Sequence, residues 1–328
     1  MFGQQENDIL VETSPLPIQE TPEDRALTET ILPPTPESPF KISKAEIRTS
    51  LRALTTEGSF ATVFYSIIGG ALLSNFLLDL GASTVEIGLL ASIPQLTNLL
   101  QPLGAYLGDR LKSRHWYSLL IFGSSRLPWL IIVPGIWLVS TSRIQSRQLV
   151  LLTLAIICLS NVMEALGRAS FLSWMAVLVP ERLRGRYFGF RNSVVTLTNL
   201  IGVPLMGLAV SKWPGGSLQG FGAVLVLGVV FATLSLVFQF SMTDVNPQIV
   251  HAADSDTDHG SPWGRVFGFL KDANFLRFLL YSGLWSFAVN VSAPFFNLYL
   301  LGDLKIDVSV VTLYNSLGFG ANLLMLMF

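Results

Sequence analysis

The sequence has 328 residues, of which 51% are hydrophobic and only 13% are charged. Typical globular domains carry about 25% charged residues, and the mean hydropathy of +0.54 is that of a membrane protein. A net charge of −1 offers no concentrated basic surface, so nucleic acid is excluded as the expected partner. The single cysteine, Cys158, excludes an intramolecular disulfide.

The chain begins with an acidic, proline-rich segment. Residues 1–40 hold eight acidic residues against Arg25 alone, and seven of the 17 prolines, a composition that cannot bury a core. We therefore expect a disordered cytoplasmic tail over residues 1–55 that ends in a short amphipathic helix. In that helix, expected over residues 41–54, Leu51 and Leu54 share an apolar face opposite basic residues, which suits a helix on the anionic inner leaflet.

Eight apolar runs follow, and each is long enough to cross a bilayer, whose hydrocarbon core needs about 20 helical residues. The expected spans are residues 59–80, 87–107, 116–139, 152–178, 187–210, 221–240, 276–300 and 310–328. The fold class is therefore an all-α polytopic membrane protein. Six spans form a first bundle, 56–240, a polar cytoplasmic linker covers 241–275, and two spans follow in 276–328. Since the last run reaches the end of the sequence without a polar flank, we expect a fragment of a longer protein.

Lysine and arginine between the spans predict the orientation. With the N-terminus inside, the cytoplasmic segments carry 14 of them and the outer loops carry four, so the positive-inside rule places the N-terminus in the cytoplasm. The 14 are Lys41, Lys44, Arg48, Arg52, Arg110, Lys112, Arg114, Arg182, Arg184, Arg186, Arg191, Arg265, Lys271 and Arg277; the four are Arg143, Arg147, Lys212 and Lys305. We expect a multi-pass protein of the plasma (inner) membrane.

Two charged loops carry a resemblance to a known family. The stretch GAYLGDRLKSRHW, Gly104 to Trp116, joins the second and third spans, and PERLRGRYFGFRN, Pro180 to Asn192, joins the fourth and fifth. Together with six spans, a polar linker and further spans, these loops resemble the major facilitator superfamily. Its motifs at these two places read approximately G-x-x-x-D-R-x-G-R-K and P-E-x-x-R-G.

The match to these motifs is partial in the first loop and closer in the second. In the first, Asp109 and Arg110 stand in register and Arg114 keeps the final charge, whereas Ala105 and Lys112 take the places of the two glycines. The residues that match the second motif are Pro180, Glu181, Arg184 and Gly185. The resemblance implies two six-helix bundles around a central path, with about eight of twelve helices present.

The loops also have a physical interpretation of their own. A carboxylate between two helices can accept hydrogen bonds from a helix N-terminus and pair with arginines of the next loop. We expect a charge cluster at Asp109, Arg110, Arg114, Glu181, Arg184 and Arg186. In the family such a cluster latches the cytoplasmic side closed. The alternative is that the basic residues serve only to hold the loops in the cytoplasm.

Three charges fall deep within the expected spans: Arg126, Glu164 and Arg168. An isolated charge at bilayer depth costs roughly 2.5 kcal/mol or more, so we expect these residues to face the bundle interior and to be paired. Glu164 and Arg168 are four residues apart and share a helix face. Three roles stay open: a structural ion-pair network, binding of an anionic solute by Arg126 or Arg168, and a coupling proton carried by Glu164.

Amides within the spans are candidates for the lining of a solute path, because lipid-facing positions do not favour them. The candidates are Gln95, Asn98, Asn290 and Asn297. The alternative for each is an ordinary hydrogen bond between helices. Gly69, Gly70 and Ser74 in the first span have the spacing that predicts close helix approach.

Enzyme motifs are missing from the sequence. It has no G-x-x-x-x-G-K-[ST] phosphate loop, no H-E-x-x-H and only three histidines, so we expect no catalysis, no cofactor and no bound metal. We expect a monomeric, gradient-driven secondary transporter that moves a small solute across the lipid bilayer, with a coupling proton as an option. The alternative is a scaffold, sensor or assembly factor that keeps the fold without transport.

Overall fold

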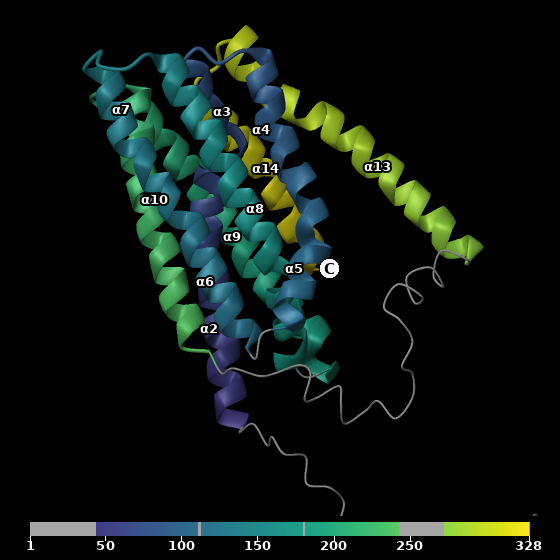
Figure 1. Cartoon of the computed structure of the whole chain (residues 1–328). Coiled ribbons are helices and arrows are strands. Elements are labelled where there is room, and N and C mark those ends of the chain that lie inside the picture. The colour runs from purple at the N-terminus through teal and green to yellow at the C-terminus, as the bar shows by residue number, and fades with distance from the viewer. Residues whose placement is uncertain (1–43, 111–112, 180, 243–271, 328) are drawn as a thin grey trace, which may run out of the picture. The chain divides into compact units, whose positions relative to one another are not determined.

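The computed structural model describes residues 44–110, 113–179, 181–242 and 272–327, and every regular element in these ranges is helical (Figure 1). The first group comprises α2 (Lys44–Ile67), α3 (Gly70–Asp79), α4 (Thr84–Thr97), η1 (Asn98–Leu100), α5 (Gln101–Asp109), α6 (Arg114–Arg126), η2 (Leu127–Ile131), α7 (Ile132–Ser140), α8 (Ser146–Leu178), η3 (Glu181–Leu183), α9 (Arg184–Ser211) and α10 (Ser217–Phe240). The second group comprises α13 (Ala273–Leu298), η4 (Tyr299–Asp303) and α14 (Val308–Met327). The all-α prediction is confirmed. The expected acidic tail and most of the linker lie outside the described residues.

Seven helices in the described ranges are long and apolar enough to cross a membrane. The remaining expected span, 87–107, is divided into α4, η1 and α5 and is not among the seven. The third span is likewise divided, into α6, η2 and α7, and is one of the seven. Two prolines accompany the division of 87–107, since Pro94 lies inside α4 and Pro102 lies in the first turn of α5. Proline lacks the backbone N–H that an uninterrupted helix needs.

The expected amphipathic helix over residues 41–54 is not a separate element. Helix α2 begins at Lys44 among the described residues and continues without a break to Ile67. The face that the sequence predicts to meet lipid is covered by protein, because Ala53 and Leu54 are buried against Trp174 and Met175. The chain remains helical through residues 55–58, Gly58 included, so the apolar face continues into the span.

A bend divides the first span between α2 and α3. Gly70 has a φ of +57°, a conformation that glycine adopts at little cost and other residues rarely adopt. A Cβ added at Gly70 would meet nothing within 4 Å, so the close helix approach predicted for this residue is wrong. The glycine pair serves the backbone bend instead.

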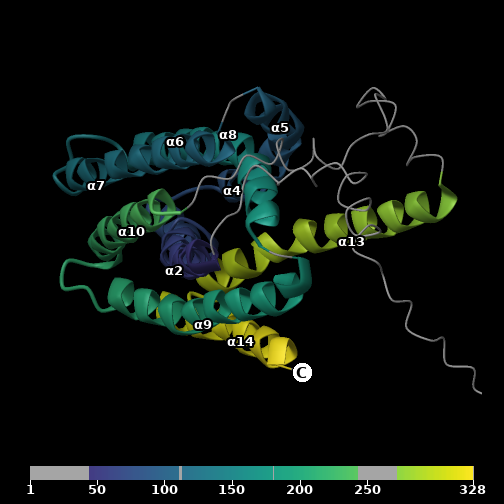
Figure 2. The same cartoon turned by 90° about the horizontal axis from the view of Figure 1, so that it is seen from below.

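Close helix approach does occur between α5 and α8. A Cβ at Gly104 would overlap the backbone of Leu166, and one at Gly108 would overlap the Ser170 hydroxyl. The two glycines are four residues apart, a spacing that lets backbones approach closely in membranes. Helix α8 also lies along α6, while α2 lies against α9 and α10 (Figure 2).

The first and second helix groups share one compact unit, Ile42–Phe328. The buried core combines residues of the first group with Leu301, Val308 and Val311 of η4 and α14. Helix α14 lies along α9 (Figure 2), whereas most side chains of α13 are exposed. This placement brings α13 and α14 to one side of α2, where cavities open.

Candidate functional site

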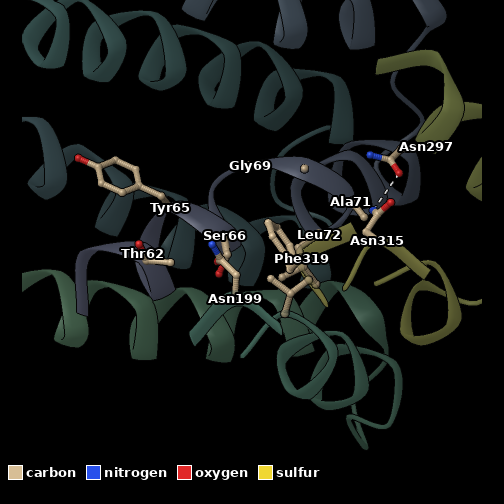
Figure 3. Close-up of a pocket in the computed structure, with 12 residues that line it drawn as sticks. Thr62, Tyr65, Ser66, Gly69, Ala71, Leu72, Asn199, Asn297, Asn315 and Phe319 are labelled. Atoms are coloured by element: carbon tan, nitrogen blue, oxygen red, sulfur yellow. Dashed lines mark hydrogen bonds between the residues drawn. The ribbon is translucent and has the colours of Figure 1, made fainter. Parts of the chain in front are cut away.

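Three cavities surround Tyr65 of α2, close to the bend in the first span. The first, which we call the asparagine cavity, has a volume of about 490 Å³ and is shown in Figure 3. Asn199 of α9, Asn297 of α13 and Asn315 of α14 contribute to its wall. The Asn315 side-chain amide donates to the Asn297 carbonyl oxygen at 3.1 Å. Both helix groups therefore build this cavity.

The second cavity, the acid cavity, has a volume of about 560 Å³. Glu164 and Arg168 of α8 line it, together with Tyr65 and with Asn297 of α13. Its wall also draws on both helix groups. Of the predicted path residues, Glu164, Arg168 and Asn297 line this cavity, whereas Arg126, Gln95, Asn98 and Asn290 do not.

The third cavity, the arginine cavity, is smaller, at about 280 Å³. Its charged lining residues are Glu57 of α2, Arg126 of α6, Arg168 of α8 and Arg191 of α9, and Tyr65 lines it as well. Arg168 and Tyr65 therefore belong to both the acid cavity and the arginine cavity. These two side chains lie where the charged cavities meet.

Arg126 is buried, with 3% of its surface exposed. Its Nη1 donates to the carbonyl oxygen of Ala232 at 2.5 Å and to the hydroxyl of Ser235 at 2.7 Å, both on α10. Its Nε is buried and has no hydrogen-bond partner among the described residues. The prediction that Arg126 faces the interior agrees with this position, but its hydrogen bonds go to a carbonyl and a hydroxyl.

Glu164 is also buried, with 7% of its surface exposed. Its Oε2 lies 3.8 Å from Nη2 of Arg168, whose side chain is 51% exposed. The Oε1 atom has no hydrogen-bond partner in the part of the chain that is described. The Tyr65 side chain is close enough to interact with both the Glu164 carboxylate and the Arg126 guanidinium. Glu164 thus pairs with Arg168 on its own helix, while Arg126 approaches from α6 without forming an ion pair to it.

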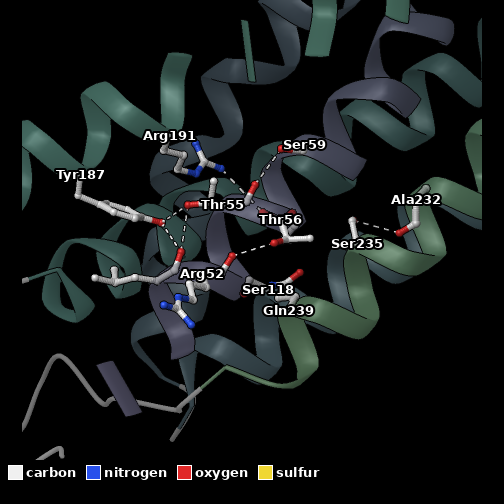
Figure 4. Close-up of polar contacts among 12 residues, drawn as sticks. Arg52, Thr55, Thr56, Ser59, Ser118, Tyr187, Arg191, Ala232, Ser235 and Gln239 are labelled. Atoms are coloured by element: carbon white, nitrogen blue, oxygen red, sulfur yellow. Dashed lines mark hydrogen bonds and ion pairs between the residues drawn. The ribbon is translucent and has the colours of Figure 1, made fainter. Parts of the chain in front are cut away.

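A second buried ion pair was not predicted from the sequence. Nη2 of Arg191 on α9 lies 3.8 Å from Oε2 of Glu57 on α2, and Glu57 is 5% exposed. A Cβ at Gly58 would approach Nη2 of Arg191 to 2.7 Å, so this glycine leaves room for the guanidinium. Tyr187, one turn before Arg191, donates to the Leu51 carbonyl at 2.9 Å and strengthens the same α2–α9 contact (Figure 4).

One signal in the sequence points to half of this pair. Tyr187 and Arg191 are four residues apart, so they share a face of a helix that begins at the second charged loop. The charge count above assigns Arg191 to the cytoplasmic side and does not involve Glu57. Sequence alone does not specify that α2 and α9 are neighbours, and the pairing depends on that contact.

The loop arginines bind groups close to them in sequence or on the adjacent helix. Arg184 donates to the carbonyl oxygens of Val179, at 3.2 Å, and Ala176, at 2.8 Å, at the end of α8. Arg110 lies over the Tyr106 ring at 4.4 Å and also bonds its hydroxyl. Arg114 donates to the Ser173 hydroxyl on α8, and Arg186 is exposed. The side chains of the two predicted acids, Asp109 and Glu181, lie outside the described residues.

The predicted amides differ in their placement. Gln95 of α4 donates to the side-chain oxygen of Asn290 on α13 at 2.9 Å, so this pair joins the two helix groups. Asn98 accepts from Gln101 at 2.8 Å within its own segment, and it is not among the residues that line the three cavities. Of the four amides, Asn297 alone lines both the asparagine cavity and the acid cavity.

A carboxylate outside the spans joins α14 to the first group. Asp307, directly before α14, accepts from the hydroxyl of Ser211 on α9 at 2.8 Å and from the Ser309 backbone N–H at 2.8 Å. The Ser309 hydroxyl also donates to it, and these hydrogen bonds hold the pKa of Asp307 below its ordinary value of 3.8. Asp307 therefore remains an anion at neutral pH.

The chemistry of the three cavities is that of binding. Within the described ranges, no group of three or more His, Cys, Asp or Glu side chains could hold a metal ion. Arginines, carboxylates, amides and one tyrosine line partly open cavities between helices. Such groups can recognise a polar or charged solute through hydrogen bonds and charge.

Comparison with known proteins agrees with this description. The family model described as Major Facilitator Superfamily matches residues 58–328. No curated protein and no solved structure matches the chain. The matching family consists of multi-pass membrane transporters of small solutes rather than enzymes. Because the family match extends over far more than half of its residues, this chain belongs to the Major Facilitator Superfamily.

Proposed function

We propose that this protein is a secondary transporter that carries a small solute through the three cavities by alternating access, driven by a gradient and not by ATP. The observation that supports this most directly is the composition of the cavity walls. Tyr65 and Glu164 come from the first helix group, whereas Asn297 and Asn315 come from α13 and α14. A solute in the asparagine cavity or the acid cavity touches both groups, so their relative movement can change its access to either side. The arginine cavity is lined by the first group alone and adjoins the acid cavity at Tyr65 and Arg168.

The bend in the first span supports the same proposal. Secondary transporters commonly form their sites at helices that are interrupted near the middle of the bilayer. The bend at Gly69 and Gly70 borders both the asparagine cavity and the acid cavity. A small change of backbone angle at Gly70 alters the position of α3 relative to Tyr65.

The transport proposal is tested with purified protein in proteoliposomes and a panel of small radiolabelled solutes. We expect at least one solute to exchange across the membrane without ATP, and we expect Asn297→Leu to slow that exchange at least tenfold. The matched control is Asn322→Leu, an exposed asparagine on α14 that does not line the cavities. ATP-dependent uptake, or equal exchange by both variants and the wild type, contradicts the proposal.

The proposed orientation has the N-terminus in the cytoplasm. Thr141 and Arg182 are exposed residues just before and just after α8, so they lie on opposite sides if α8 spans the bilayer. In a background that lacks Cys158, a cysteine at Thr141 should react with an impermeant thiol reagent added to intact cells. A cysteine at Arg182 should react only after the cells are opened, and the reverse pattern would contradict the orientation.

We propose that the two charged loops form the cytoplasmic gate. The gate residues are Asp109, Arg110, Arg114, Glu181, Arg184 and Arg186. Arg184 and Arg114 tie the loops to the end of α8, the helix that carries Glu164. A gate residue stabilises one end state of the transport cycle. Asp109→Asn should therefore slow transport at unchanged expression, and unchanged uptake would reduce Asp109 to a loop charge.

A further inference from the structure

The arginine cavity has more positive than negative charge in its wall. Its lining holds three arginines, Arg126, Arg168 and Arg191, and one carboxylate, Glu57. Glu164 pairs with Arg168 from the adjoining acid cavity. When Glu164 is included, the charged groups are three cations and two anions. Arginine stays charged at every physiological pH, so loss of a proton cannot remove this excess.

Each carboxylate faces an arginine at 3.8 Å, and buried polar atoms remain without a hydrogen-bond partner among the described residues on both sides: Glu57 Oε2 and Glu164 Oε1, and the Nε atoms of Arg126 and Arg191. Glu57 pairs with Arg191, and Glu164 pairs with Arg168. Arg126 is 3% exposed, and its Nε has no hydrogen-bond partner within the described ranges. The buried Nε of Arg191 likewise has none there. A buried cation with unsatisfied donors at membrane depth is costly, and an anion in the cavity satisfies both the charge and the donors.

Apart from Thr62 and Tyr65, the uncharged residues of the cavity wall are apolar or glycine. Phe122 of α6 and Phe171 of α8 line it with ring centroids 5.6 Å apart in an edge-to-face arrangement, and Leu172 and Met175 continue this surface. Inorganic anions gain nothing from such a wall. An anion that carries an apolar or aromatic body gains the burial of that body on the two rings.

We propose that the solute of this transporter is a small organic monoanion with an apolar body, bound in the arginine cavity. This inference rests on the proposed transport function. The anionic group lies among Arg126, Arg168 and Arg191, and the apolar body lies on Phe122 and Phe171. A carboxylate suits the site because a guanidinium can bind its two oxygens with two parallel hydrogen bonds.

Arg168 has a distinct part in this site. It lines both charged cavities, and its side chain is 51% exposed although its partner Glu164 is buried. Its distance of 3.8 Å to Glu164 is longer than that of a close charged hydrogen bond. The guanidinium can therefore turn from Glu164 toward an anion in the arginine cavity without breaking a tight pair.

The first test compares acids with their neutral amides. Thermal unfolding of the purified protein in detergent is measured with benzoate, phenylacetate and hexanoate, and with benzamide, phenylacetamide and hexanamide. A ligand that binds only the folded protein raises its unfolding temperature as its concentration increases. We expect at least one acid to do so while its amide does not. If no acid is distinguished from its amide, the inference is overturned.

The second test uses variants of Arg168, whose side chain is half exposed; because Arg168 also pairs with the buried Glu164, the unfolding temperature of each variant is first measured without ligand. Arg168→Gln should weaken binding of the selected acid at least tenfold, and Arg168→Lys should weaken it several-fold. The matched control is Arg143→Gln, which removes an exposed arginine that lies over Trp137 in a distant loop. It should bind as the wild type does. Equal affinity of Arg168→Gln and the control overturns the inference.

Binding and transport measurements together distinguish a failure of the anion site from a failure of the transporter. Binding at equilibrium needs no transport, so an acid that binds but never crosses proteoliposomes contradicts the transporter and leaves the anion site supported. Conversely, exchange of neutral or cationic solutes with no preference for anions contradicts the anion site and leaves the transporter supported.

Discussion

Arginines in two regions of the molecule find different partners. In the interior, Arg191 pairs with a carboxylate 134 positions away along the chain, and Arg126 bonds α10 groups more than 100 positions away. At the start of α9, Arg184 bonds carbonyls five and eight positions away. Arg184 therefore completes the end of the preceding helix, whereas Arg126 and Arg191 find partners on other helices. Arg168, whose side chain is half exposed, pairs within its own helix. Changes in the interior should therefore cost more stability.

The largest loss of stability is expected when the ion pair between Glu57 and Arg191 is broken. Glu57→Gln leaves the largely buried Arg191 side chain, 17% exposed, without its counter-charge. Because the two groups are 3.8 Å apart, we expect a cost at the lower end of the range for buried pairs, about 3 kcal/mol. We expect a large loss of unfolding temperature in detergent, together with less folded protein. Arg191→Gln should destabilise for the same reason.

The double variant sharpens this prediction. Glu57→Gln combined with Arg191→Gln removes both charges, so it should be less destabilised than the sum of the two single variants. Arg182→Gln is the matched control, since it removes an exposed arginine near the start of α9. Strictly additive effects would show that Glu57 and Arg191 do not depend on one another.

A smaller loss of stability is expected when Arg184 is changed. Arg184→Gln loses two hydrogen bonds to the last carbonyls of α8 and the favourable charge at that helix end, which together are worth about 1 kcal/mol at a partly exposed site. Arg184→Lys should lose less, because it keeps the charge. Unfolding temperatures of the two variants, with Arg182→Gln for reference, measure the difference. A loss as large as that of Glu57→Gln would contradict the contrast between the regions.

The smallest change in stability is expected from the protonation of Asp307, directly before α14. Hydrogen bonds from Ser309 and Ser211 hold the pKa of Asp307 below its ordinary value of 3.8. The stability they contribute is therefore complete above that value and is lost as the pH falls through the lower pKa of the folded protein. Between pH 6 and pH 3, the unfolding temperature of the wild type should fall more than that of Asp307→Asn. Asp303→Asn, an exposed carboxylate nearby, should behave as the wild type does.

Much of the fold could be predicted from local patterns. Apolar runs of about 20 residues specify membrane helices, and eight such runs correspond to the helices of the described residues, with the second run divided at Pro94 and Pro102. The positions of Arg126 and Glu164 deep in these runs also predicted that both would be buried. Burial follows from the cost of an exposed charge in lipid, and that cost depends on position in the run rather than on any particular neighbour.

The sequence by itself determined which segments are helices and which charges must avoid lipid, because both depend on the order of residues within about 20 positions. The tertiary structure decided which charges meet. Glu57 and Arg191 became partners because α2 lies against α9, and Tyr65 lines three cavities whose walls include residues of α8, α9, α13 and α14. Helix periodicity assigns a residue to a face but does not specify the helix opposite that face, since neighbouring helices are selected by contacts between residues far apart in sequence.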